Sequence, residues 1–190
     1  MKSFYPTFGL TRQGLAMHCF VAFFTLAALF FASPAMAADY YWVGGSGNWS
    51  EHASHWATTS GGGVFHNQVP TSMDDVHFDA NSFPAGGTVT IDQTIVYCRN
   101  MDWAGAANAP VFSGAGDKRL HVYGSLTFIS GMTLSYSGQI RFLSTLTGNT
   151  VTTAGKMLSG QVFFEGIGGE WTLLDNFTSS NRISHTTGIF

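Results

Sequence analysis

Residues 120–177 have the sequence LHVYGSLTFISGMTLSYSGQIRFLSTLTGNTVTTAGKMLSGQVFFEGIGGEWTLLDNF, in which short apolar alternations are separated by Gly, Ser, Thr or Asn. Similar alternations begin at Leu120, Ile140 and Val162, so their spacing is nearly constant at about 20–22 residues. Each alternation has the period of two that places successive side chains on opposite faces of a strand.

A second set of alternations repeats in the same way. It begins at Leu126, Asn149 and Trp171, with a spacing of about 22–23 residues. The slightly shorter interval from Met101 to Leu120 extends the repeat toward the N-terminus. A loose period with about three short strands in each repeat is typical of a solenoid, in which each repeat packs only on its neighbours. We therefore predict an all-β coil of stacked strands.

Residues 1–37 have the features of a secretory signal peptide. A basic start is followed by an apolar run at 19–32 and by small residues that end at Ala37. This pattern predicts cleavage between Ala37 and Ala38. An uncleaved membrane anchor is the alternative, although the run is shorter than the roughly 20 residues that span a bilayer. No transmembrane segment is expected after cleavage.

Residues 38–190 are long enough for one domain with its own core. They contain six basic and eleven acidic residues, which gives a net charge of −5 and argues against nucleic acid as a partner. Their one cysteine, Cys98, excludes an internal disulfide. We expect Cys98 to be a small buried residue on a strand.

Several motifs in the N-terminal part resemble the opening module of large secreted bacterial surface proteins. They are YWVGGSGNWS at 41–50, Trp56, Val69-Pro70, DDVHFD at 74–79 and TVTID at 88–92. The family consists of adhesin-like and autotransporter-passenger-like proteins. Their fold is a right-handed parallel β-helix, and they share no catalytic residues that can be transferred to this chain.

The resemblance implies a right-handed parallel β-helix with an aromatic-rich N-terminal cap, located outside the cell or at its surface. We expect residues 38–115 to form the cap and first strands, and residues 116–190 to form the solenoid turns. The chain stops at residue 190, partway through a turn whose strand is due at 181–183. We therefore expect a truncated product, or the N-terminal piece of a longer reading frame.

Asp75, His77 and Asp79 are the candidate metal ligands. In a strand these three side chains share one face, while Val76 and Phe78 point inward. Two carboxylates beside an imidazole are a ligand set for a divalent cation such as calcium. The alternative is a solvated outer face, with no cofactor.

Trp42, Trp49 and Trp56 form the second candidate site, a platform on which sugar rings could stack. The alternative is that these large apolar side chains close the N-terminal end of the coil.

No nucleophile or cysteine–histidine motif indicates an enzyme. Asp102, Asp117, Lys118 and Arg119 could converge one turn apart, as in polysaccharide lyases and hydrolases with this fold. We predict a non-catalytic, adhesin-like structural module of the cell surface, with surface glycans or host and cell-surface proteins as partners. The alternative function is a carbohydrate-active β-helix enzyme of lyase or hydrolase type, or a glycan-binding module.

Overall fold

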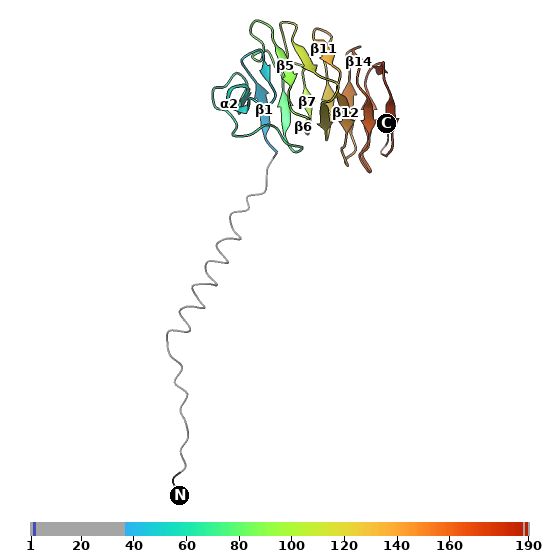
Figure 1. Ribbon diagram of the computed structural model, residues 1–190, viewed down its shortest axis with the longest axis horizontal. Helices are drawn as coiled ribbons and strands as arrows, with labels where there is room; N and C mark the ends of the chain where they lie inside the picture. Colours follow the sequence, from blue (N-terminus) through green and yellow to red (C-terminus); the bar gives the residue numbers. More distant parts are fainter. Residues whose placement is uncertain (1, 3–36, 188, 190) are drawn as a thin grey trace. The chain divides into compact units, whose positions relative to one another are not determined.

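The computed structural model describes residues 2, 37–187 and 189. Apart from Lys2 and Ala37, the predicted signal peptide lies outside these residues. Residues from Ala37 onward form one compact unit, a parallel β-solenoid of about five turns. The prediction of a parallel all-β coil is confirmed, and its right-handed sense stays a prediction. Figure 1 shows the strands of this coil lying side by side.

Each complete turn contributes one strand to each of three sheets. The first sheet contains β1 (Asp39–Trp42), β4 (Asp75–His77), β7 (Met101–Asp102), β10 (Leu126–Thr127), β13 (Asn149–Thr152) and β16 (Trp171–Leu173). The second contains β2 (Gly47–Asn48), β5 (Thr88–Ile91), β8 (Val111–Gly114) and β11 (Thr133–Tyr136), followed by the separate pair β14 (Met157–Leu158) and β17 (Thr178–Ser179). The third contains β6 (Ile95–Cys98), β9 (Arg119–Val122), β12 (Gln139–Phe142), β15 (Val162–Phe164) and β18 (Ile183–His185).

The pairing in the third sheet agrees with the spacing predicted from the sequence. Leu120 pairs with Ile140, and Ile140 pairs with Val162. Leu120, Ile140 and Val162 are buried, whereas the residues that alternate with them along each strand point outward. The intervals from Leu120 to Ile140 and from Ile140 to Val162 are therefore true turn lengths of the coil.

The first sheet agrees with the prediction only in part. Asn149 pairs with Trp171 as predicted, but Leu126 pairs with Val151 instead of Asn149. This shift by two positions leaves the inward face unchanged, so alternation cannot detect it. The repeat includes Met101 as predicted, but Met101 pairs with Leu126 in the next turn and not with Leu120.

A short antiparallel segment covers the N-terminal end of the coil. The chain leaves β1 and β2, forms the single-turn helix α2 (His52–His55) and returns as β3 (Trp56–Ala57), which pairs antiparallel with β1. Parallel stacking already begins with β1 and β4, where Asp39 pairs with Asp75. Parallel turns therefore extend through much of the segment between residues 38 and 115.

Aromatic rings from successive turns stack inside the coil. Phe78 lies on Trp103 with ring centroids 3.7 Å apart, and Phe142 lies on Phe164 at 4.7 Å. All four rings are buried. Cys98 is also buried on its strand, as predicted, and burial raises the pKa of its thiol. The interior is thus held by packing between turns.

Polar side chains link three successive turns at the corner between the third and first sheets. Asp75 Oδ1 accepts hydrogen bonds from Arg99 Nε at 2.7 Å, Asn100 Nδ2 at 2.8 Å and the Asn100 backbone N–H at 3.1 Å, and Arg99 Nη2 donates to Oδ2. Asn100 Oδ1 accepts the backbone N–H of Ser125 at 2.7 Å. Burial alone would raise the pKa of Asp75, but the hydrogen bonds and charge of Arg99, with those from Asn100, lower it.

Replacing Phe142 with alanine tests the interior stacking. Phe142→Ala should lower the free energy of unfolding by about 3–5 kcal/mol, because it leaves a cavity beneath Phe164. The measurement is urea unfolding followed by circular dichroism. Thr152→Ala, on the outward side of β13, is the control and should change stability by less than about 0.5 kcal/mol. Equal effects would contradict the assignment of the two faces.

Replacing Asp75 tests the polar link. Asp75→Asn should lower the free energy of unfolding by about 1–3 kcal/mol at neutral pH, because it removes charge-assisted hydrogen bonds. The folded-state pKa is depressed, so this contribution is present above the unfolded-state pKa of about 3.9 and is lost as pH falls through the folded-state value. The stability gap between wild type and variant should therefore narrow below that pH.

The matched control for Asp75→Asn is Asp117→Asn. Asp117 is exposed, and its Oδ2 lies 3.3 Å from Nζ of the adjacent Lys118. Its loss should change stability by less than about 1 kcal/mol. If the difference in unfolding free energy between wild type and Asp75→Asn stayed constant from neutral to acid pH, the negative charge of Asp75 would not contribute to stability.

Candidate functional site

The outward-facing side chains of the three sheets differ in chemical character. In the first sheet, aspartates on β1, β4 and β7 give way to threonines on β10, β13 and β16. The second sheet presents mainly hydroxyl groups, from Thr88, Thr90, Ser113, Thr133 and Ser135. The third sheet presents arginines, aromatic rings and amides. Each face therefore offers a different surface to a partner.

Two of the candidate metal ligands, Asp75 and His77, lie on β4 and point outward with Val76 buried between them, as the alternation predicts, and Asp79 follows the strand. Each has a different partner. Asp75 is engaged by Arg99 and Asn100, His77 Nε2 lies 2.9 Å from Asp39 Oδ1, and Asp79 Oδ1 accepts the backbone N–H of Asn81 at 2.8 Å. No group of three metal-ligating side chains forms within the described residues. The chain thus does not bring Asp75, His77 and Asp79 together as a calcium site.

The tryptophans predicted to stack on sugars lie inside the N-terminal end of the coil. Trp42, Trp49 and Trp56 have exposed fractions of 0%. Trp42 and Trp49 each meet Trp56 edge to face, with centroids 4.9 and 4.8 Å apart, and the imidazole of His55 stacks on Trp42 at 4.6 Å. Buried rings offer no free face to a sugar, so a glycan would have to bind elsewhere.

The aspartates of the motifs make structural hydrogen bonds in the cap. Asp74 is buried, and its Oδ1 accepts the backbone N–H of Ala38 at 2.9 Å. Asp92 accepts hydrogen bonds from the Ser50 backbone N–H at 3.1 Å and the Ser50 hydroxyl at 2.5 Å. Ser50 therefore ties the cap to the following turn and does not cap α2, which begins after Glu51 without a side-chain hydrogen bond.

The residues considered for an enzyme do not converge. Asp102 lies on β7 in the first sheet, whereas Arg119 lies on β9 in the third. Asp102 Oδ1 accepts the backbone N–H of Ala104 at 2.8 Å, and Asp117 pairs with its neighbour Lys118. These four residues therefore form no common groove.

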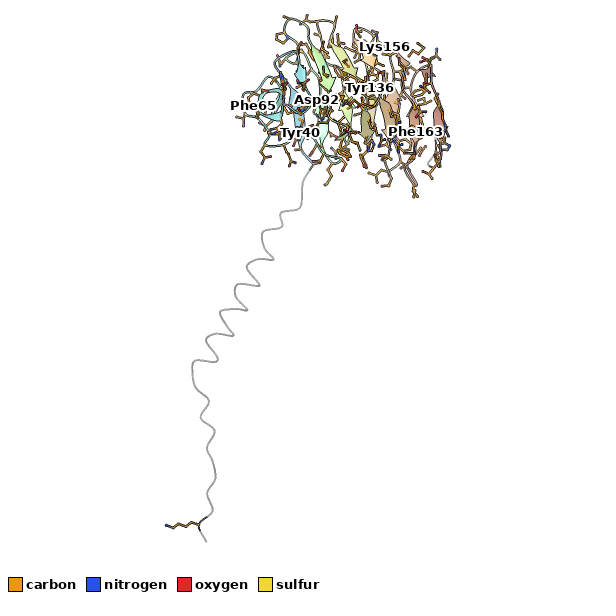
Figure 2. The ribbon with its side chains drawn as sticks, viewed as in Figure 1. Tyr40, Phe65, Asp92, Tyr136, Lys156 and Phe163 are labelled. Atoms are coloured by element: carbon orange, nitrogen blue, oxygen red, sulfur yellow. The ribbon has the colours of Figure 1, made fainter. Side chains whose placement is uncertain are left out.

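The outer side of the third sheet carries a cluster that sequence analysis missed. Two rows of side chains cross its strands in register, and we call them the basic–aromatic face. One row is Ile95, Arg119, Gln139, Gln161 and Arg182, and the other is Tyr97, His121, Arg141, Phe163 and Ser184. Both rows lie wholly within the described residues, and neither contains an acidic side chain. In Figure 2, Phe163 lies toward the C-terminal end of the coil and Tyr40 toward the N-terminal end.

Arg141 is held in position by its neighbours on this face. Its guanidinium lies over the ring of Phe163, 4.7 Å from the centroid. Nη1 donates to Glu165 Oε2 at 3.0 Å, and Nε donates to Gln139 Oε1 at 3.4 Å. Nη2 donates to no acceptor among the described residues. The guanidinium is thus preorganised and keeps a free donor.

The electrostatics of the face are visible at His121. Its pKa is lowered by burial and by the nearby charges of Arg141 and Arg119. Tyr97 meets the imidazole edge to face with centroids 5.4 Å apart, and Nε2 has no hydrogen-bond partner within the described chain. Burial and the two neighbouring arginines both disfavour the protonated form of the imidazole.

Two adjoining grooves run along the margin of the basic–aromatic face, at the corner with the first sheet. Their volumes are about 390 and 370 Å³, and Ser72 borders both. The larger is lined in part by Met73, Tyr123 and Leu146, and the smaller by Val69, Pro70 and Tyr97. The margin is therefore concave and mostly apolar.

A signal for this face exists in the sequence, but only after alignment of the turns. The interval from Leu120 to Ile140 brings Arg119 beside Gln139 and His121 beside Arg141. The net charge of −5 over residues 38–190 conceals this local concentration of positive charge.

Among the described residues, no helix is long and apolar enough to cross a membrane. Comparison of the chain with protein-family models, with curated proteins and with solved structures finds no match. The chain is a parallel β-solenoid of about five turns with stacked aromatic rings in its interior.

Proposed function

We propose that this chain is a secreted, non-catalytic structural module of an adhesin-like surface protein. The in-register coil supports this role, because each added turn buries its inward side chains on the previous turn without a new core. The residue patterns at 41–50, 74–79 and 88–92, which resemble the opening module of such proteins, support it further. They fall on β1, β2, β4 and β5, the first elements of the coil.

The second sheet gives the observation that carries the proposal. Its outward rows are Thr88–Val111–Thr133 and Thr90–Ser113–Ser135, so neighbouring turns present mainly hydroxyl groups and no ionisable side chain. Most enzymes that hydrolyse glycosidic bonds need two carboxylates at a defined separation for acid and base roles. A smooth hydroxyl-rich face suits a stalk, and we expect no catalytic activity.

The start of β1 supports export with cleavage after Ala37. The backbone nitrogen of Ala38 lies 2.9 Å from Oδ1 of the buried Asp74, whose Oδ2 accepts from Thr71 N and Oγ1. Cleavage at this bond would convert the amide of Ala38 into an ammonium group. The buried carboxylate would then gain a cationic partner, as buried charges require.

The stability of two N-terminal forms tests this processing site. Protein that begins at Ala38 should unfold with a free energy about 1–3 kcal/mol greater than protein that begins at Ala37, because only the first pairs an ammonium with Asp74. Asp74→Asn should remove the difference between the two forms, which a thermodynamic cycle measures. An equal difference in the Asp74→Asn background would refute the pairing.

Labelling of intact cells tests the proposed role. Antibody against residues 38–190 should bind unpermeabilised cells that express the full gene, and N-terminal sequencing of the exposed product should begin at Ala38. Purified protein should release no reducing sugar or unsaturated uronate from a polysaccharide panel. Labelling that requires permeabilisation would contradict the surface location, and turnover of any polysaccharide would favour the enzyme alternative.

A further inference from the structure

We propose that the basic–aromatic face of the third sheet binds an anionic polysaccharide, which lies across the strands in the direction in which the turns stack. The inference rests on the proposed extracellular function and names the partner class of one outer face. Three properties of the face carry it: the concentration of arginines, the side chains between them and the spacing of the rows.

The basic residues of the chain beyond Ala37 are concentrated at this sheet. Five of the six lie in its strands or directly beside them: Arg99, Lys118, Arg119, Arg141 and Arg182. Arg99 and Lys118 are paired with aspartates, whereas Arg119 and Arg182 are exposed and form no ion pair within the described residues. Arg141 is paired with Glu165 through Nη1, and its Nη2 donates to no acceptor among the described residues. Guanidinium groups bind carboxylate or sulfate oxygens through paired N–H donors.

The side chains between the arginines suit a sugar chain. Tyr97 is 37% exposed and Phe163 is half-buried, so both offer apolar ring surface to the C–H faces of pyranose rings. Gln139 and Gln161, joined by a hydrogen bond of 3.4 Å, supply amide donors and acceptors for hydroxyl groups. Only three of the ten side chains in the two rows are arginines, whereas nucleic-acid binding depends mainly on contacts of basic side chains with phosphates, so the face suits a sugar polymer better than nucleic acid.

The spacing of the face requires a polymer. Neighbouring strands lie about 4.8 Å apart, so Arg119 on β9 and Arg182 beside β18, three strands apart, are separated by roughly 14 Å. One sugar cannot contact both arginines, whereas an oligomer of several sugars can. Simultaneous contacts along one chain then raise the overall affinity.

Binding measurements with defined polymers test the proposal, using protein purified after expression of the full-length gene, whether it is secreted or retained in the cell. Polygalacturonate, dextran sulfate, uncharged dextran and single-stranded DNA are the probes, at low and high salt. We expect saturable, salt-sensitive binding of at least one anionic polysaccharide and none of dextran. Preference between polygalacturonate and dextran sulfate identifies carboxylate or sulfate as the recognised group. Binding of neither, or tighter binding of DNA, would overturn the proposal.

Matched charge removals locate the site. Arg119→Gln and Arg182→Gln should each weaken binding by about tenfold, as expected for loss of a charge-assisted hydrogen bond. Lys156→Gln removes the same charge beside β14, outside the third sheet, and should leave affinity within about twofold. Arg119→Lys should give an intermediate affinity, because it keeps charge but loses the paired donors. Equal losses at Lys156 and Arg119 would overturn the assignment.

His121 provides an independent readout. Burial and then the charges of Arg141 and Arg119 lower the pKa of His121, whose imidazole also meets Tyr97 on the neighbouring strand. A bound anion would offset the charges of the two arginines. The pKa of His121, followed by NMR, should therefore rise when the saturating polysaccharide is added. An unchanged His121 titration at saturation would show that the polymer binds elsewhere.

The two proposals fail separately. Protein that is displayed on intact cells but binds no anionic polysaccharide would overturn this inference and leave the structural role. Protein that binds polygalacturonate through Arg119 but never leaves the cell would overturn the extracellular role.

Discussion

The stacking of inward side chains from one turn on those of the next is the constraint on which this structure depends. No single turn has a core of its own, and residues 38–190 contain only one cysteine, so no internal disulfide can hold the turns together. Phe142 is buried because Phe164 lies on it in the following turn. A slip of one residue between neighbouring strands would turn every inward ring outward, so the alternation strongly specifies the register.

This constraint explains how much of the fold could be predicted. The intervals from Leu120 to Ile140 and to Val162 indicated the correct strand pairs, because alternation and turn length are both visible in the sequence. Leu126 was paired two positions away from its true partner, Val151. Two strand registers that differ by two residues bury the same side chains. The corner loops decide between these registers, and their sequences show no apolar–polar alternation from which the register could be predicted.

The candidate sites were less predictable, because they depend on contacts between turns. Alternation correctly placed Asp75 and His77 on an outer face. It could not reveal that Arg99 and Asn100, one turn later, would occupy the carboxylate of Asp75. Arg119 and Arg141 likewise become one cluster only when β9 and β12 are aligned. In a solenoid, the register between turns decides which outward side chains become neighbours. The composition of an outer face therefore cannot be predicted from one segment of the sequence.

The net charge of residues 38–190 is negative, but the basic–aromatic face is positive. These two observations are compatible because the outward charges of the coil lie on different sheets. At physiological salt, exposed charges interact over about 8 Å. The charges of the face that a ligand contacts therefore affect its binding more than the net charge of the whole chain. The outward aspartates of β1, β4 and β7 lie in the first sheet, whereas Arg119 and Arg141 lie in the third. A negatively charged chain can therefore carry a positively charged surface. Since outward side chains contribute little to the interior packing, each face can acquire its own chemistry without a change of fold.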